Sequence, residues 1–299
     1  MSDERRSPAN AYLYAMVAVL FWATSASAFK LSLRHVGVLS LLFIASATST
    51  FAFGIYLLAT KRLALLKAFS RKDYLWSAGL GFLNPFLYYV VLFKAYSLLP
   101  AQEAQPINFV WPLTLVLLSI PLLGQRIRFA SILAILISFT GVVVIATRAT
   151  GPADILRFRF SNSTGVLLAL STTIVWALFW ILNAKDRCDE AVRLFVNFAF
   201  ATGYILIALL LAGRLPMAPW QGLVGGVYVG LFEMGITFLA WLKALKAAPT
   251  TAHVVNLIYL VPFLSLLVIA LVLGETILPS TVIGLVCIVA GILAQKRWA

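Results

Sequence analysis

The sequence predicts an all-α membrane protein in which ten transmembrane helices form two inverted five-helix repeats around a central cavity. Three observations lead to this fold class. The composition is too apolar for a soluble surface, ten apolar runs are long enough to cross a bilayer, and spaced positions in the first half of the chain recur in the second.

The composition excludes a soluble globular domain. The chain has 299 residues, of which 62% are hydrophobic and only 11% charged, and its mean hydropathy is +0.99. Soluble domains carry about 25% charged residues. The net charge of +13 does not indicate a nucleic-acid partner, because Lys and Arg stand in short clusters between apolar runs. Cys188 and Cys287 form neither a disulfide framework nor a metal site.

Ten runs are long enough for spanning helices, which need roughly 20 mostly apolar residues each. Loop and capping signals such as Lys61-Arg62, Leu99-Pro100 and Gly213-Arg214 mark their ends. The first run lacks a small-residue cleavage pattern and is interpreted as a spanning helix. The predicted spans are 12–33, 38–60, 74–98, 103–123, 129–148, 163–184, 191–212, 221–246, 251–273 and 280–296.

The distribution of basic residues predicts the orientation. With a cytoplasmic N-terminus, most of the 23 Lys and Arg residues fall on the cytoplasmic side of the predicted spans. The positive-inside rule therefore places both termini in the cytoplasm. The loop 148–162 is an exception, because it is basic on the opposite side.

An internal repeat divides the chain into a first half, 1–150, and a second half, 151–299, within one integrated membrane bundle. Five spans per half is an odd number, so the second half must be inserted upside down relative to the first. Inverted repeats are typical of secondary transporters, whose substrate site lies near the midplane. Pro112, Gly124 and Gly141 recur 150 residues later as Pro262, Gly274 and Gly291, and Gly81, Lys94, Ala95 and Pro100 recur 149 residues later as Gly230, Lys243, Ala244 and Pro249.

These repeated positions, together with Trp22 and Lys30 in the first span, resemble the drug/metabolite transporter superfamily and, within it, the ten-helix EamA-type family. The stretches 21–25, 107–113 and 254–262 resemble the YddG-type aromatic amino acid exporters of that family. The sequence departs from the family pattern at Gln125, where a glutamate is usual, and in the aromatic run 176–180. The resemblance implies export of phenylalanine, tryptophan and tyrosine across a bacterial inner membrane by alternating access.

Glu233 is the one acidic residue placed in the middle of a predicted span, and its counterpart in the first repeat is Asn84. A carboxylate at that depth costs at least ~2.5 kcal/mol, so it should face a cavity or a partner. It can contact the amine of a substrate or couple transport to protons. Alternatively, a protonated Glu233 forms a structural hydrogen bond between helices.

Further candidates line the same spans. Pro112 and Pro262 would kink two equivalent helices and act as hinges, unless they only curve them. Asn108 and Asn256 precede these prolines and either contact an amino acid substrate or bond to neighbouring helices. Deep aromatic residues either line a substrate pocket or pack in the core, and they are Trp22, Tyr88, Tyr89, Trp111, Trp176, Trp180 and Tyr259.

No motif indicates a cofactor, a metal or catalysis. The chain lacks a phosphate-binding glycine loop, a His-Glu-x-x-His motif and a Cys cluster, so neither ATP-driven transport nor an intramembrane enzyme is expected. The expected partners are a small-molecule substrate and the lipid bilayer, and a monomer is compatible with the sequence. The alternative within transporters is an exporter of another metabolite or of an organic-cation drug.

Overall fold

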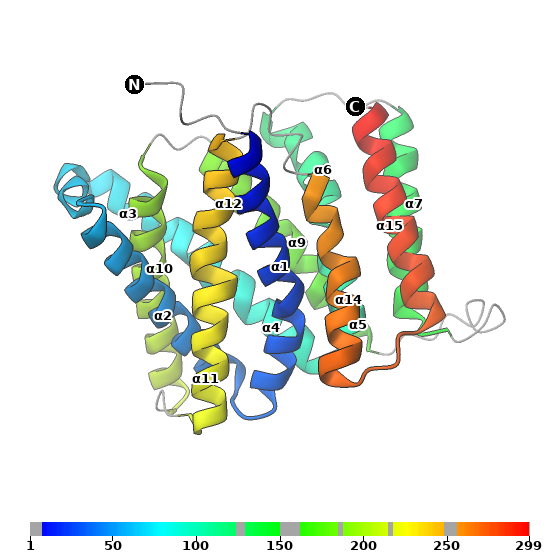
Figure 1. Cartoon of the computed structure of the whole chain (residues 1–299), viewed down its shortest axis with the longest axis horizontal. Coiled ribbons are helices and arrows are strands. Elements are labelled where there is room, and N and C mark those ends of the chain that lie inside the picture. Colours follow the sequence, from blue (N-terminus) through cyan, green and yellow to red (C-terminus); the bar gives the residue numbers. More distant parts are fainter. Residues whose placement is uncertain are drawn as a thin grey trace. The chain divides into compact units, whose positions relative to one another are not determined.

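The computed structural model describes residues 8–123, 129–149, 162–184, 188–214, 218–247 and 256–298, and these ranges form helices joined by short turns (Figure 1). No β-strand occurs within them. The helices of the first half are α1 Pro8–Leu33, α2 Val38–Ala59, η1 Leu63–Ala68, α3 Arg71–Gly81, η2 Phe82–Leu87, α4 Tyr88–Leu98, α5 Ala101–Asn108, α6 Trp111–Leu123 and α7 Phe129–Ala146. Those of the second half are α9 Ser163–Ala184, α10 Glu190–Leu211, α11 Trp220–Tyr228, η3 Val229–Gly235, α12 Ile236–Ala247, η4 Asn256–Tyr259, α14 Leu260–Leu273 and α15 Pro279–Trp298.

The chain is a multi-pass membrane protein. Within the described ranges, 6 helices are long and apolar enough to cross a bilayer, and each coincides with a predicted span. The other predicted spans hold shorter helices, among them the apolar segments Leu260–Leu273 and Pro279–Ala294. The spanning helices are Asn10–Leu33, Val38–Ala59, Arg71–Leu98, Ser163–Leu182, Glu190–Leu211 and Trp220–Ala244.

The helices group into two compact units. Unit 1 comprises Met1–Val90 and Asp186–Val268, and unit 2 comprises Val91–Lys185 and Ile269–Ala299. Each unit therefore contains segments from both halves of the sequence.

In unit 1, two glycines bring helices into close contact. α2 and α10 lie side by side (Figure 1), and α10 also packs on α3. A Cβ added to Gly230 would lie 2.5 Å from the carbonyl oxygen of Ala45 in α2, and a Cβ on Gly81 would overlap the carbonyl of Asn197 in α10. Small residues of this kind allow backbones to approach closely in membranes.

Two π-helical segments interrupt the long helices of unit 1 at equivalent places in the proposed repeat. η2 separates α3 from α4, and within it Asn84 has non-helical backbone angles (φ −148°, ψ 120°). η3 separates α11 from α12 and carries Glu233. Segments of π-helix are rare and occur frequently at functional sites, so these two interruptions mark the region around Asn84 and Glu233.

In unit 2, α7 and α15 lie side by side (Figure 1). Gly141 and Gly284 face each other across this contact, and a Cβ on Gly284 would lie 2.5 Å from the carbonyl oxygen of Gly141. The Ser138 hydroxyl donates to the carbonyl of Ile288 at 3.0 Å. Glu275 accepts from the backbone N–H groups of Ala101 and Gln102 at 3.0 and 3.2 Å and so caps the N-terminus of α5.

The sequence predicted that both repeated prolines kink continuous helices. In the structure, each proline instead stands near the start of a helix. Residues 109–110 form a turn between α5 and α6, and Pro112 is the second residue of α6. Pro262 is the third residue of α14, directly after η4. A proline in the first turn of a helix removes no helical hydrogen bond. A new helix therefore starts just before each proline, after the turn 109–110 or after η4. Their role as hinges stays a prediction.

The contact of Gly230 with α2 can be tested by Gly230→Ala. The new methyl group would overlap the carbonyl of Ala45 and the side chain of Thr48, so we expect the variant to be less stable by about 1–3 kcal/mol. The measurement is thermal unfolding in detergent. Gly203→Ala in α10 is the control, because a Cβ there meets no atom within 4 Å. Equal melting temperatures for both variants would contradict the close contact.

Candidate functional site

Glu233 lies in η3 and accepts hydrogen bonds from hydroxyl groups on two other segments of unit 1. The Ser25 hydroxyl in α1 donates to Oε2, and the Tyr89 hydroxyl in α4 donates to Oε1 at 3.1 Å. The three residues are buried, with exposed fractions of 4% for Ser25, 0% for Tyr89 and 8% for Glu233. The structure thus places a buried carboxylate and its two donors together.

Hydroxyl groups of α1 connect this site to α11. Thr24 and Ser25 are adjacent, and their hydroxyl oxygens lie 2.7 and 3.2 Å from the carbonyl oxygen of Phe21, one turn earlier. The Thr24 hydroxyl also lies 2.7 Å from the Tyr228 hydroxyl. These contacts orient the side chains of α1 toward α11 and η3, on which Glu233 stands.

Aromatic residues accompany the carboxylate and its donors on each of these segments. The rings of Tyr88 and Tyr89 make an edge contact with centroids 4.8 Å apart. Phe232, next to Glu233 in sequence, contacts Phe21 at 4.8 Å and Tyr228 at 4.9 Å. We call Ser25, Glu233 and these five aromatic residues the Glu233 cluster; such rings suit an aromatic or cationic ligand.

Trp22 belongs to a neighbouring aromatic group in unit 1. Its ring lies 5.6 Å from Trp241 and 6.4 Å from Phe238. The tryptophan is 8% exposed. Core packing against α12 accounts for these contacts, so the structure does not connect Trp22 directly to Glu233.

Four predicted site residues lie together in unit 2. The Asn108 amide donates to the Thr172 hydroxyl at 2.8 Å. Trp176 contacts Trp111 at 6.4 Å and Trp180 at 5.9 Å between ring centroids. For Asn108 this is the interhelical hydrogen bond that the sequence left open as one alternative, between α5 and α9.

The remaining predicted residues are less informative. Asn84 is 2% exposed, and its Oδ1 accepts no hydrogen bond within the described part of the chain. Asn256 and Tyr259 stand in η4, but their side chains lie outside the described residues, as does the side chain of Pro112. Pro262 is buried.

Sequence reasoning missed Ser25 as a partner of Glu233. The residue is part of the Trp22-Ala-Thr-Ser stretch, and a hydroxyl three positions after a tryptophan carries no distinctive signal. Only the rotation of α1 relative to η3 decides that this hydroxyl faces the carboxylate.

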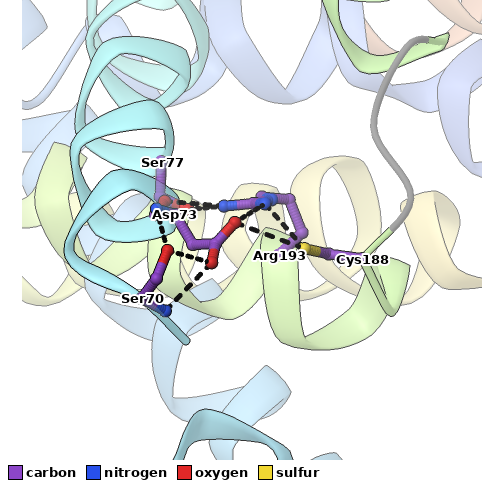
Figure 2. A network of polar contacts seen from close by, with 5 residues as sticks. All are labelled: Ser70, Asp73, Ser77, Cys188 and Arg193. Atoms are coloured by element: carbon purple, nitrogen blue, oxygen red, sulfur yellow. Dashed lines mark hydrogen bonds and ion pairs between the residues drawn. The ribbon is translucent and has the colours of Figure 1, made fainter. Parts of the chain in front are cut away.

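A second polar network lies at the starts of α3 and α10 (Figure 2). Arg193 donates to the carbonyl oxygen of Asp73 and to the Ser77 hydroxyl, both at 2.7 Å, and lies 2.8 Å from Cys188 Sγ. Asp73 in turn forms a capping box with Ser70 at the N-terminus of α3. The Arg193 side chain is 4% exposed, and its ion pair with Asp73 measures 3.5 Å. The network joins the two helix starts.

Unit 2 contains a buried carboxylate that the sequence did not single out. Glu103, in the first turn of α5, has a side chain that is 0% exposed and forms an ion pair of 3.0 Å with Arg148 after α7. The sequence correctly placed Glu103 at a helix end. Its burial depends on how α5 packs against α7, which sequence spacing does not reveal.

The Arg193 network is testable by Arg193→Ala. The substitution removes the hydrogen bonds to the Asp73 carbonyl and to Ser77, so we expect destabilisation by about 2–3 kcal/mol. The matched control is Arg62→Ala, because the Arg62–Asp189 pair has side chains 44% and 26% exposed and should contribute less than about 1 kcal/mol. Melting temperatures of the purified variants give the comparison, and a small effect for Arg193→Ala would refute a structural role for the network.

Comparison with known proteins connects the chain to transporters. The profile of the EamA-like transporter family matches twice, over residues 9–147 and 163–294. The aromatic amino acid exporter YddG of Ancylobacter novellus is 27% identical over 288 residues, which cover 94% of both chains. A solved crystal structure that is 23% identical aligns with a TM-score of 0.67 over 97% of this chain and 98% of the other, so the fold is shared.

Two further relatives match over shorter lengths. An uncharacterized transporter of Clostridium kluyveri is 28% identical over 57% of this chain and only 55% of its own length. A probable terminal-alkyne amino-acid exporter of Streptantibioticus cattleyicolor is 28% identical over 66% of this chain and 65% of its own. Because the family profile covers nearly the whole sequence, this multi-pass membrane protein belongs to the EamA-like transporter family.

Proposed function

We propose that the chain is a secondary transporter that exports aromatic and hydrophobic amino acids from the cytoplasm by alternating access. The observation that carries the proposal is the Glu233 cluster, in which Ser25 and Tyr89 donate to a buried carboxylate and the same segments carry aromatic rings that contact one another. An amino acid with a large side chain needs both a few polar contacts and an apolar surface.

The names of two relatives support an amino acid substrate. YddG of Ancylobacter novellus is an aromatic amino acid exporter, and the Streptantibioticus cattleyicolor protein is a probable exporter of terminal-alkyne amino acids. Both substrates are zwitterions with an apolar side chain. The cluster offers groups for each part: a carboxylate for the ammonium group and rings for the side chain.

The ten-span architecture and the two inverted halves, 1–150 and 151–299, are part of the proposal. They are supported by the separate match of each half to the same family profile. The π-helical segments η2 and η3 occupy corresponding positions in the two halves. Alternating access around a central cavity would use hinges near Pro112 and Pro262, both of which follow a helix interruption.

Within unit 1, Glu233 is proposed to bind the ammonium group of the substrate. The tryptophan group of unit 2, formed by Trp111, Trp176 and Trp180, is proposed separately as an aromatic surface of that unit. The full proposed set is Trp22, Asn84, Tyr88, Tyr89, Asn108, Trp111, Trp176, Trp180, Glu233, Asn256 and Tyr259.

The substrate is tested by uptake of labelled tryptophan, phenylalanine and threonine into proteoliposomes that contain the full chain. We expect saturable uptake of tryptophan and phenylalanine and little uptake of threonine, because only the first two carry a ring to pack on the aromatic groups. Parallel runs with and without an imposed pH gradient identify the driving force. If none of the three amino acids moves, the amino acid proposal is wrong, and other metabolites and organic cations are the next substrates to test.

The proposed location is the bacterial inner membrane with both termini in the cytoplasm, as the excess of Lys and Arg on one side indicates. A fluorescent protein fused after Ala299 should fluoresce, and alkaline phosphatase fused at the same position should be inactive. The same fusions after Gly213, in a loop assigned to the opposite side, should show the reverse. Active phosphatase at the C-terminus would overturn the orientation.

A further inference from the structure

We propose that the Glu233 cluster recognises the ammonium group of its ligand through that group's N–H donors. The protein would therefore also transport aromatic monoamines that lack a carboxylate, such as phenylethylamine. This inference rests on the proposed function, because it assigns to the same transport site a second class of substrate.

Glu233 has no cationic partner within the described residues. The ion pairs found there join Arg62 to Asp189, Arg148 to Glu103 and Arg193 to Asp73. Glu233 forms none of them. A buried charge without a partner is costly, and a positively charged ligand would remove that cost.

The carboxylate of Glu233 is only partly used as an acceptor. Within the described residues, Oε2 accepts one hydrogen bond, from Ser25, and Oε1 accepts one, from Tyr89. A carboxylate has about four lone-pair sites, so each oxygen retains acceptor capacity. The two hydroxyl groups come from α1 and α4 and fix the carboxylate from two sides. An ammonium group can therefore donate N–H bonds to an acceptor that is already oriented.

Two aromatic groups stand on the segments that hold the carboxylate. Phe21 lies one turn before Ser25 in α1, and its ring contacts that of Phe232, which in turn contacts Tyr228. The ring of Tyr88 contacts that of Tyr89, whose hydroxyl donates to Glu233. Aromatic faces attract cations and accommodate the ring of an arylethylamine. Both parts of such an amine, the charge and the ring, match groups within this cluster.

The carboxylate of an amino acid substrate finds no ion-pair partner on the groups that bond to Glu233. Within the described residues these are the hydroxyls of Ser25 and Tyr89, and neither is basic. A ligand carboxylate gains no ion pair there and is repelled by Glu233 itself. Removing it should therefore cost little affinity, whereas removing the ammonium group should cost much.

The test compares four ligands that share one phenyl ring. Phenylalanine, phenylethylamine, phenylpropionate and N,N,N-trimethylphenylethylammonium are measured as inhibitors of labelled phenylalanine uptake into proteoliposomes and as ligands in thermal-shift titrations in detergent. We expect phenylethylamine to bind within about tenfold of phenylalanine. Phenylpropionate and the trimethylated amine should bind about 10- to 150-fold more weakly, because each lacks the charge-assisted N–H bond to Glu233.

Variants connect the effect to the cluster. Glu233→Gln keeps the shape of the side chain and should weaken the binding of phenylethylamine by the same factor of about 10 to 150. Glu190→Gln removes an equal charge from the first turn of α10 and should leave the ligand order unchanged. Tyr89→Phe and Ser25→Ala should weaken the binding of both amines and amino acids without changing the ratio of their affinities, because both residues position Glu233.

The outcomes separate the two proposals. Uptake of phenylalanine without any binding of phenylethylamine overturns the inference and leaves the proposed function intact. Binding of phenylethylamine that depends on Glu233, in a protein that moves no amino acid, supports the inference and overturns the proposed function. Equal binding of the primary and trimethylated amines, or unchanged binding in Glu233→Gln, overturns the inference whatever the amino acid result.

Discussion

The hydrocarbon core of a bilayer offers no hydrogen-bonding partner, and most features of this structure are consequences of that constraint. Continuous helices pair their backbone groups internally. Hydroxyl side chains turn back onto their own helix, as Ser32 does toward the carbonyl of Ala28 at 2.7 Å. Where η3 departs from α-helical geometry, a neighbouring helix supplies a donor, because the Ser49 hydroxyl of α2 lies 2.7 Å from the carbonyl of Gly230. Irregular backbone is thus tolerated where a packed neighbour provides a hydrogen bond.

Charged side chains follow the same constraint in different ways. Arg193 and Glu103 are both buried, but each stands near a helix end and is paired with an opposite charge. Glu233 is buried in the middle of a long helix and receives two neutral hydroxyl donors. Neutral donors stabilise a carboxylate without cancelling its charge. The charges of Arg193 and Glu103 are therefore already paired with opposite charges near other helix ends. Within the described residues, the carboxylate of Glu233 is not paired in this way, which fits the proposed binding of a cationic ligand.

The sequence predicted the helices well and their mutual contacts poorly. Apolar runs ended by glycine, proline and charged pairs located the spans, and α9 begins and ends at the predicted residues, 163 and 184. The depth of Glu233 was also readable, because it depends on position along the chain, and the residue lies in the middle of the span Trp220–Ala244. The donors Ser25 and Tyr89 were not paired with it in advance. Their contact depends on how α1 and α4 are rotated toward η3, and rotation is set by packing that one sequence does not encode locally.

Two features of α5 also depended on packing and local geometry that the sequence did not reveal. The fourth predicted span proved to be two helices, α5 and α6, because the residues before Pro112 form a turn. A proline in an apolar run is compatible with a kink or with a new helix start, and the sequence alone does not distinguish these. Glu103 was placed correctly at a helix end, yet its pairing with Arg148 needed the approach of α5 to the end of α7.

The two glycine contacts of unit 1 also have a consequence for the two proposed halves of the chain. Gly81, in the third predicted span, rests on α10, the second helix of the other half, and Gly230, its counterpart, rests on α2, the second helix of the first half. The contact is therefore reciprocal, as in a twofold-symmetric dimer, where each subunit presents the same patch and receives the same patch. If the two halves are inverted copies of one five-helix unit, as proposed, that unit carries both the glycine and the surface that receives it, and two such units inserted in opposite directions form the contact twice.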